Sequence, residues 1–172
     1  MGQYYKPISI EKRQHVLSHD YDNGLKLMQH SWIGNKFVGV VEELIAKGGA
    51  WHGDRIVWAG DYADKEKNRK SNLYDIARAK IQPPVSKKKY RFVINLDTQE
   101  FVDKNKVPVT EVYEKFEYKI HPLPLLTCEG NGRGGGDYHK DHELVGKWAR
   151  NRVIVANRAP KGFKEIIFDL VE

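Results

Sequence analysis

One stretch of this chain, residues 36–47, has the spacing of apolar side chains that a sustained amphipathic helix requires. Asn35 stands where an N-cap side chain is preferred, and Gly48 stands where a C-cap glycine is common. The apolar positions in between are Phe37, Val38, Val41, Leu44 and Ile45. The other apolar runs are shorter, and most of them are typical of strands.

The strand-like runs predict an α+β fold with a mainly antiparallel sheet and one long helix packed on one face. A second, short helix is expected after Asn72, and a tight turn is expected at residues 97–99. Pro7 favours an edge strand or a bulge. No break in composition divides the chain, so we expect a single domain, residues 1–172. The expected strands cover residues 4–10, 25–28, 54–60, 90–96, 100–103, 111–120, 153–156 and 166–171.

The charge balance is basic, with 29 Lys and Arg against 23 Asp and Glu in 172 residues. A net charge of +6 favours anionic partners such as nucleotides, nucleic acid or an acidic protein surface. Two basic runs, residues 64–70 and 87–89, are interpreted as solvated loops. No apolar stretch of about 18 residues predicts a membrane span. The absence of a secretory signal and the single Cys128 favour a reducing, cytoplasmic location.

Residues 51–60 and 148–157 align without a gap, with Trp, Arg and Ala at the same offsets. This internal repeat predicts two strands in related positions of the fold. In one interpretation, Trp51, Arg55, Trp148 and Arg152 contribute to a ligand site. In the other, the two tryptophans are core anchors, because each indole buries a large apolar area, and the arginines are surface residues.

A glycine-rich segment, residues 129–142, places five glycines among residues 130–136. Glycine lets a ligand approach the backbone closely, and successive amides can bind an anion. The segment matches neither a Walker loop nor a dinucleotide-binding turn that opens a helix. A mobile loop is the alternative interpretation. The candidate ligand-binding residues here are Arg133, Gly134, Gly135, Gly136, Asp137 and Tyr138.

Carboxylate and imidazole side chains in the same segment are of the types that bind zinc or manganese. They are Asp137, His139, Asp141 and His142. Solvated polar side chains are the favoured interpretation, so no metal or cofactor is expected. The standard hydrolase and zinc-protease motifs do not occur, and the sequence favours a binding protein over an enzyme.

Four segments together resemble a family of small uncharacterised bacterial and phage proteins: residues 2–4, 53–63, 132–137 and 145–149. In some members of that family the glycine loop leads directly into a Trp-Ala-Gly-Asp-Arg-Ile strand that ends in Gly-Asp-Tyr-Ala. Here the two pieces are divided between the repeated segments, and the chain departs from the pattern at Arg150 and Asn151 and again at Asn157 and Arg158. The resemblance implies that the glycine loop and the two Trp/Arg strands form one site.

These observations predict a small intracellular protein that binds a nucleotide or nucleotide-derived signal, and the resemblance implies that it is phage-encoded. Sequestration of a host immune messenger is an extension of the family resemblance. Arg133 would hold phosphate, and Trp51, Trp148 or Tyr138 would stack on a base. This hypothesis leaves residues 87–89 outside the site. The alternatives are a basic protein that inhibits a host protein or binds nucleic acid, and a metal-dependent phosphoesterase. A homo-oligomer is compatible with the sequence.

Overall fold

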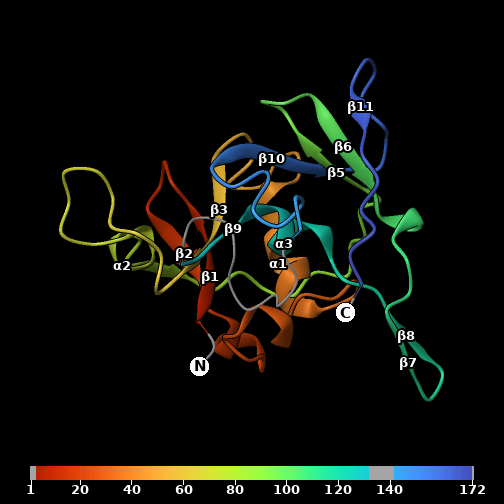
Figure 1. The fold of residues 1–172 in the computed structure, drawn as a ribbon, viewed down its shortest axis with the longest axis horizontal. Coiled ribbons are helices and arrows are strands. Elements are labelled where there is room, and N and C mark those ends of the chain that lie inside the picture. The colour runs from red at the N-terminus through yellow and green to blue at the C-terminus, as the bar shows by residue number, and fades with distance from the viewer. Residues whose placement is uncertain (1–2, 132–141, 172) are drawn as a thin grey trace.

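The computed structural model describes residues 3–131 and 142–171 and confirms an α+β fold (Figure 1). In the described residues a nine-stranded sheet has the order β11-β6-β5-β10-β3-β1-β2-β4, with β9 added beside β3. Its strands are β1 (Tyr5–Ser9), β2 (Gln14–Val16), β3 (Arg55–Gly60), β4 (Ala79–Ile81), β5 (Phe92–Asn95), β6 (Glu100–Asp103), β9 (Cys128–Glu129), β10 (Asn151–Ala156) and β11 (Lys164–Glu165).

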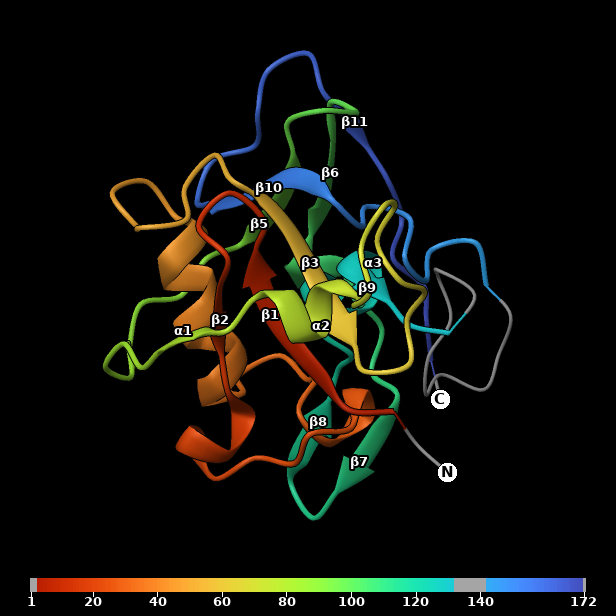
Figure 2. The same ribbon diagram turned by 90° about the vertical axis from the view of Figure 1, so that its left-hand side faces the viewer.

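The helices are short apart from α1 (Lys36–Ile45). The others are α2 (Leu73–Ile76), α3 (Pro122–Thr127) and the 3₁₀ helices η1 (Ser18–Tyr21), η2 (Leu27–Gln29) and η3 (Lys104–Lys106). Strands β7 (Glu111–Tyr113) and β8 (Phe116–Tyr118) form a separate hairpin at the periphery of the molecule (Figures 1 and 2). No helix among the described residues is long and apolar enough to cross a membrane.

The sheet consists of two equivalent halves. The first half runs β1, β2, η1, α1, β3, and the second runs β5, β6, η3, α3, β10. In each half the first strand lies antiparallel between the other two, and a further parallel strand flanks the outer one: β4 beside β2, and β11 beside β6. The halves meet where β3 and β10 pair antiparallel, with Arg55 opposite Arg152. An approximate two-fold axis therefore passes between these two residues.

The two halves are interleaved rather than merely adjacent. Ala46, which follows α1, forms a parallel bridge with Val155 of β10 in the second half. In the equivalent position, Cys128 follows α3 and pairs in parallel with Trp58 of β3 in the first half. Each helix is thus connected to a strand of the other half.

Alternation along β3 and β10 separates the core into layers. Ile56 and Val153 face the main core, which also contains α1 and α3 side chains, whereas Val57 and Ile154 face the opposite side of the sheet. There, α2 packs against β1 and β3 (Figure 2). The main core is a single cluster to which both halves contribute.

Helix α1 forms where its apolar spacing predicts, and the Asn35 side chain accepts hydrogen bonds from the amides of Phe37 and Val38. It ends at Ile45, before the expected Gly48, because Ala46 turns into the extended conformation that bridges to β10. Helix α2 begins at its predicted cap, Asn72.

Three strand predictions are corrected. Residues 27–29 form η2, and residues 111–118 form a hairpin in place of one strand. At the C-terminus only Lys164 and Glu165 are paired as a strand, while Phe168 and Leu170 are buried as apolar anchors. Pro7 lies in an interior strand, but β2 pairs only with Ile8 and Ser9, so β2 does not reach the proline.

Candidate functional site

The glycine-rich segment contains six of the ten predicted ligand-binding residues: Arg133, Gly134, Gly135, Gly136, Asp137 and Tyr138. All six lie outside the described residues, as do His139 and Asp141. Anion binding by the backbone amides of this segment and the alternative metal site therefore remain predictions.

The two tryptophans of the repeat are core residues. Trp51 and Trp148 are both 0% exposed. Trp51 Nε1 donates to Gln14 Oε1 at 2.9 Å, and Trp148 Nε1 donates to Glu100 Oε1 at 3.1 Å. Because neither indole has an exposed face in this structure, the predicted stacking of Trp51 or Trp148 on a ligand base is corrected. The same prediction for Tyr138 lies outside the described residues. Both tryptophans act as core anchors, as the alternative interpretation expected.

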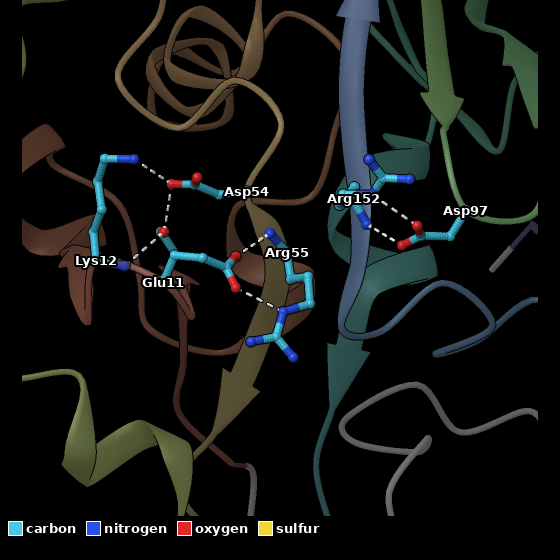
Figure 3. A network of polar contacts seen from close by, with 7 residues as sticks. Glu11, Lys12, Asp54, Arg55, Asp97 and Arg152 are labelled. Atoms are coloured by element: carbon cyan, nitrogen blue, oxygen red, sulfur yellow. Dashed lines mark hydrogen bonds and ion pairs between the residues drawn. The ribbon is translucent and has the colours of Figure 1, made fainter.

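The two arginines of the repeat lie opposite each other in the sheet, on β3 and β10 (Figure 3). The Arg55 amide and Nε both donate to the Glu11 carboxylate, at 2.5 and 2.6 Å. In the same way, the Arg152 amide and Nε donate to the Asp97 carboxylate, each at 2.8 Å. These bonds lower the pKa of Asp97. Each arginine therefore has a carboxylate partner and connects its strand to the turn of the neighbouring hairpin.

A second pair of contacts repeats next to the arginines. Ser9 Oγ donates to Asp54 at 2.7 Å, and Asn95 Nδ2 donates to Asn151 at 3.0 Å. Matching backbone pairings and matching side-chain contacts show that the ten-residue alignment reflects related positions in the fold. This prediction is confirmed.

A cavity of about 760 Å³ opens elsewhere, between the first turns of α1, the segment before β5 and η3. Seven of its lining residues are cationic, and Glu42 is the single carboxylate among the described lining residues. The cations are Lys36, Lys87, Lys88, Lys89, Arg91, Lys104 and Lys119. We call this cavity the basic pocket. The sequence interpretation assigned residues 87–89 to a solvated loop and did not predict it.

Some of these cations already have partners. Arg91 forms a two-bond pair with Asp103, and Lys36 and Lys88 form exposed pairs with acidic side chains. Lys87, Lys89 and Lys119 form no ion pair with any residue in 3–131 or 142–171. The rim of the pocket therefore carries uncompensated positive charge.

The floor of the pocket contains a buried ion pair. Lys104 Nζ lies 2.6 Å from Glu42 Oε2, and His121 Nε2 lies 3.3 Å from Glu42 Oε1. Burial would raise the pKa of Glu42, but His121 and Lys104 outweigh burial and hold this pKa below its ordinary value. Burial lowers the pKa of His121, whose Nδ1 accepts from the Leu123 amide. The floor therefore pairs an ionised Glu42 with the Lys104 ammonium, and these two charges balance each other.

No group of three or more metal-binding side chains occurs in the described part of the chain. Comparison with protein-family models finds no matching family, and comparisons with curated proteins and with solved structures find no match either. The geometry of the basic pocket is therefore the basis for a functional proposal.

Proposed function

We propose that this chain binds a small anionic ligand of the nucleotide class in the basic pocket. The observation that carries the proposal is the accumulation of lysines around a cavity of about 760 Å³, three of them without an ion-pair partner among the described residues. Small-ligand pockets typically measure about 300–1,000 Å³. A nucleotide fits a cavity of this volume, and its phosphates supply the negative charge that the rim lacks.

The pocket combines charge with neutral polar groups. Lysine ammonium groups bind phosphate as point charges. Asn105 also lines the cavity, and its side-chain amide can donate and accept hydrogen bonds. The pocket lies at the beginning of α1, whose dipole favours a negative charge there. These features support binding of an organic phosphate.

The proposal is for binding without turnover. A protein of this kind would act by sequestering its ligand, and an intracellular nucleotide-derived signal is the ligand class that we propose. A host messenger as the sequestered signal is an extension of this proposal, made from the resemblance to uncharacterised bacterial and phage proteins.

Replacement of Lys87, Lys88 and Lys89 together by Gln tests the location of the site. Each charge-assisted hydrogen bond contributes about 1.5–3 kcal/mol, so the triple variant should bind nucleoside diphosphates at least about tenfold more weakly. The matched control replaces the exposed Lys65, Lys70 and Lys161, which removes the same charge outside the pocket. Isothermal titration calorimetry measures the affinity of both variants for ADP, GDP, CDP and UDP.

Two outcomes would relocate the ligand. If the Lys87, Lys88 and Lys89 variant binds normally while Arg133→Ala loses about 1.5–3 kcal/mol of binding free energy, the ligand lies at the glycine-rich segment. If both triple variants weaken binding equally, and a single-stranded oligonucleotide binds with a steep salt dependence, the basic surface as a whole binds nucleic acid.

A further inference from the structure

Gly39 lies in the interior of α1, where glycine is an unfavourable residue. Glycine in a helix interior costs about 1 kcal/mol relative to alanine. Close packing explains other glycines, such as Gly49 beyond the end of α1, where an added Cβ would lie 2.3 Å from the Glu43 carbonyl oxygen. At Gly39 an added Cβ would meet no atom within 4 Å. Packing in this structure therefore does not require glycine at this position.

Gly39 lines the basic pocket. It lies four residues after Asn35 and three before Glu42, which also line the cavity, so the three share one face of α1. The missing side chain thus leaves a recess along the helix, between the helix N-terminus and the ion pair of Glu42 and Lys104. We call this space the Gly39 recess.

The other residues of the pocket give it a polar gradient. The lysines at 87–89 are exposed at the rim, whereas Tyr90 and Ile33 line the cavity and pack against the main core. At the floor, Glu42 offers an acceptor and Lys104 a donor side by side, without net charge. A flat, weakly polar ring with hydrogen-bonding groups on its edge matches these surroundings better than a second phosphate does.

We propose that the Gly39 recess takes the ring portion of the ligand while the phosphates remain at the lysine rim. Gly39 is then a specificity-determining residue, because it makes the pocket select ring-bearing phosphates over inorganic phosphates. This inference rests on the proposed function and adds the class of ligand that the site selects.

Two kinds of probe separate the ring from the phosphates. Inorganic pyrophosphate and the nucleoside diphosphates ADP, GDP, CDP and UDP carry the same diphosphate without and with a ring. The wild-type chain should bind at least one nucleoside diphosphate about tenfold or more tightly than pyrophosphate. Gly39→Leu should lower the affinity for that nucleotide to the affinity for pyrophosphate, and it should leave the affinity for pyrophosphate unchanged.

Two further variants control for folding and for the added side chain. Gly39→Ala should raise the thermal unfolding midpoint, because alanine is the better helix former. It should lower the affinity for the nucleotide less than Gly39→Leu does. Lys47→Leu adds the same side chain at an exposed position outside the pocket and should leave all affinities unchanged. Should Gly39→Leu fail to fold, Gly39→Ala still tests the recess, because an unchanged nucleotide affinity there contradicts it.

The inference is overturned if folded Gly39→Leu binds the nucleotide as well as the wild type does. It is also overturned if pyrophosphate binds as tightly as all four nucleotides. In both cases, weaker pyrophosphate binding by the Lys87, Lys88 and Lys89 variant would still support the proposed function. If none of the five probes binds the wild-type chain, the proposed function and this inference both fail.

Discussion

His30 shows how a buried polar side chain acquires a fixed protonation state. It is fully buried, and its Nε2 accepts from Trp58 Nε1 at 2.9 Å. Its Nδ1 lies 2.9 Å from the carbonyl oxygen of Gly24 and must therefore carry the proton. Protonation of Nε2 would place two donors against each other. Burial, opposed only by the Gly24 bond, lowers the pKa of His30 from 6.5 to about 4.

This pKa predicts a loss of stability in mild acid. The unfolded chain takes up the proton near pH 6.5, but the folded chain does so only near pH 4. Stability from this residue is therefore complete above pH 6.5 and falls as the pH drops toward 4. Between about pH 7.5 and about pH 5, the free energy of unfolding should fall by about 2 kcal/mol because of His30. Urea titrations at both pH values measure it.

The control is His30→Gln, which retains an acceptor for Trp58 but does not titrate. Burial also lowers the pKa of His15 and His121, so the wild-type loss has several sources. Only the difference between wild type and variant belongs to His30. Equal losses in the two proteins would contradict the assignment.

Helix α1 depends on its cap as well as on its apolar face. The Asn35 side-chain oxygen Oδ1 accepts from two amides of the first turn, at 2.8 and 3.1 Å. Its amide nitrogen also donates to Asn23 Oδ1 at 2.7 Å. One side chain therefore begins the helix and fixes the preceding loop to it.

Replacing Asn35 by Ala should lower the free energy of unfolding by about 0.5–2 kcal/mol, the range for losing an N-cap. Asn35→Asp is the matched control, because it keeps the capping acceptor and adds a charge that the helix dipole favours. It loses the bond to Asn23 and leaves two acceptor oxygens facing each other there, so it should be less stable than the wild type. In chemical denaturation, the wild type and Asn35→Asp should therefore have a higher free energy of unfolding than Asn35→Ala. An Asn35→Ala variant as stable as the wild type would show that the cap does not contribute to stability.

Across the whole molecule, the two halves share their stabilising contacts. The parallel pairings at Val155 and Trp58 each join a helix of one half to a strand of the other. The main core also joins the halves, because Phe37 and Trp51 belong to the same cluster as Leu125 and Trp148. Neither half buries its apolar face alone.

Separate fragments of residues 1–86 and 87–172 should therefore lack cooperative thermal unfolding when expressed singly. When they are expressed together, they should associate into a complex with the circular dichroism spectrum of the intact chain. The physical reason is that each fragment exposes the core surface that the other covers. A fragment that melts cooperatively as a monomer would show that the halves are independent domains.

Much of the local structure could be predicted from the sequence. Caps and apolar periodicity act between near neighbours, and they located α1, α2 and the strand around Ile56. The repeat of Trp, Asp or Asn, and Arg indicated two related strands, because equivalent turns need equivalent side chains. Helix α3 was missed because six residues with two prolines give too little helical spacing.

The pairing of the strands, the burial of Trp51 and Trp148 and the basic pocket required the three-dimensional structure. The pocket brings together α1, the lysines at 87–89, η3 and Lys119, which are far apart in the chain. A run of lysines has the same local pattern whether it faces solvent or a cavity. Burial, and the gathering of charged side chains around one cavity, arise from contacts between residues far apart in the chain. The lysines that locally indicate a solvated loop therefore become the rim of a site once the two halves have folded together.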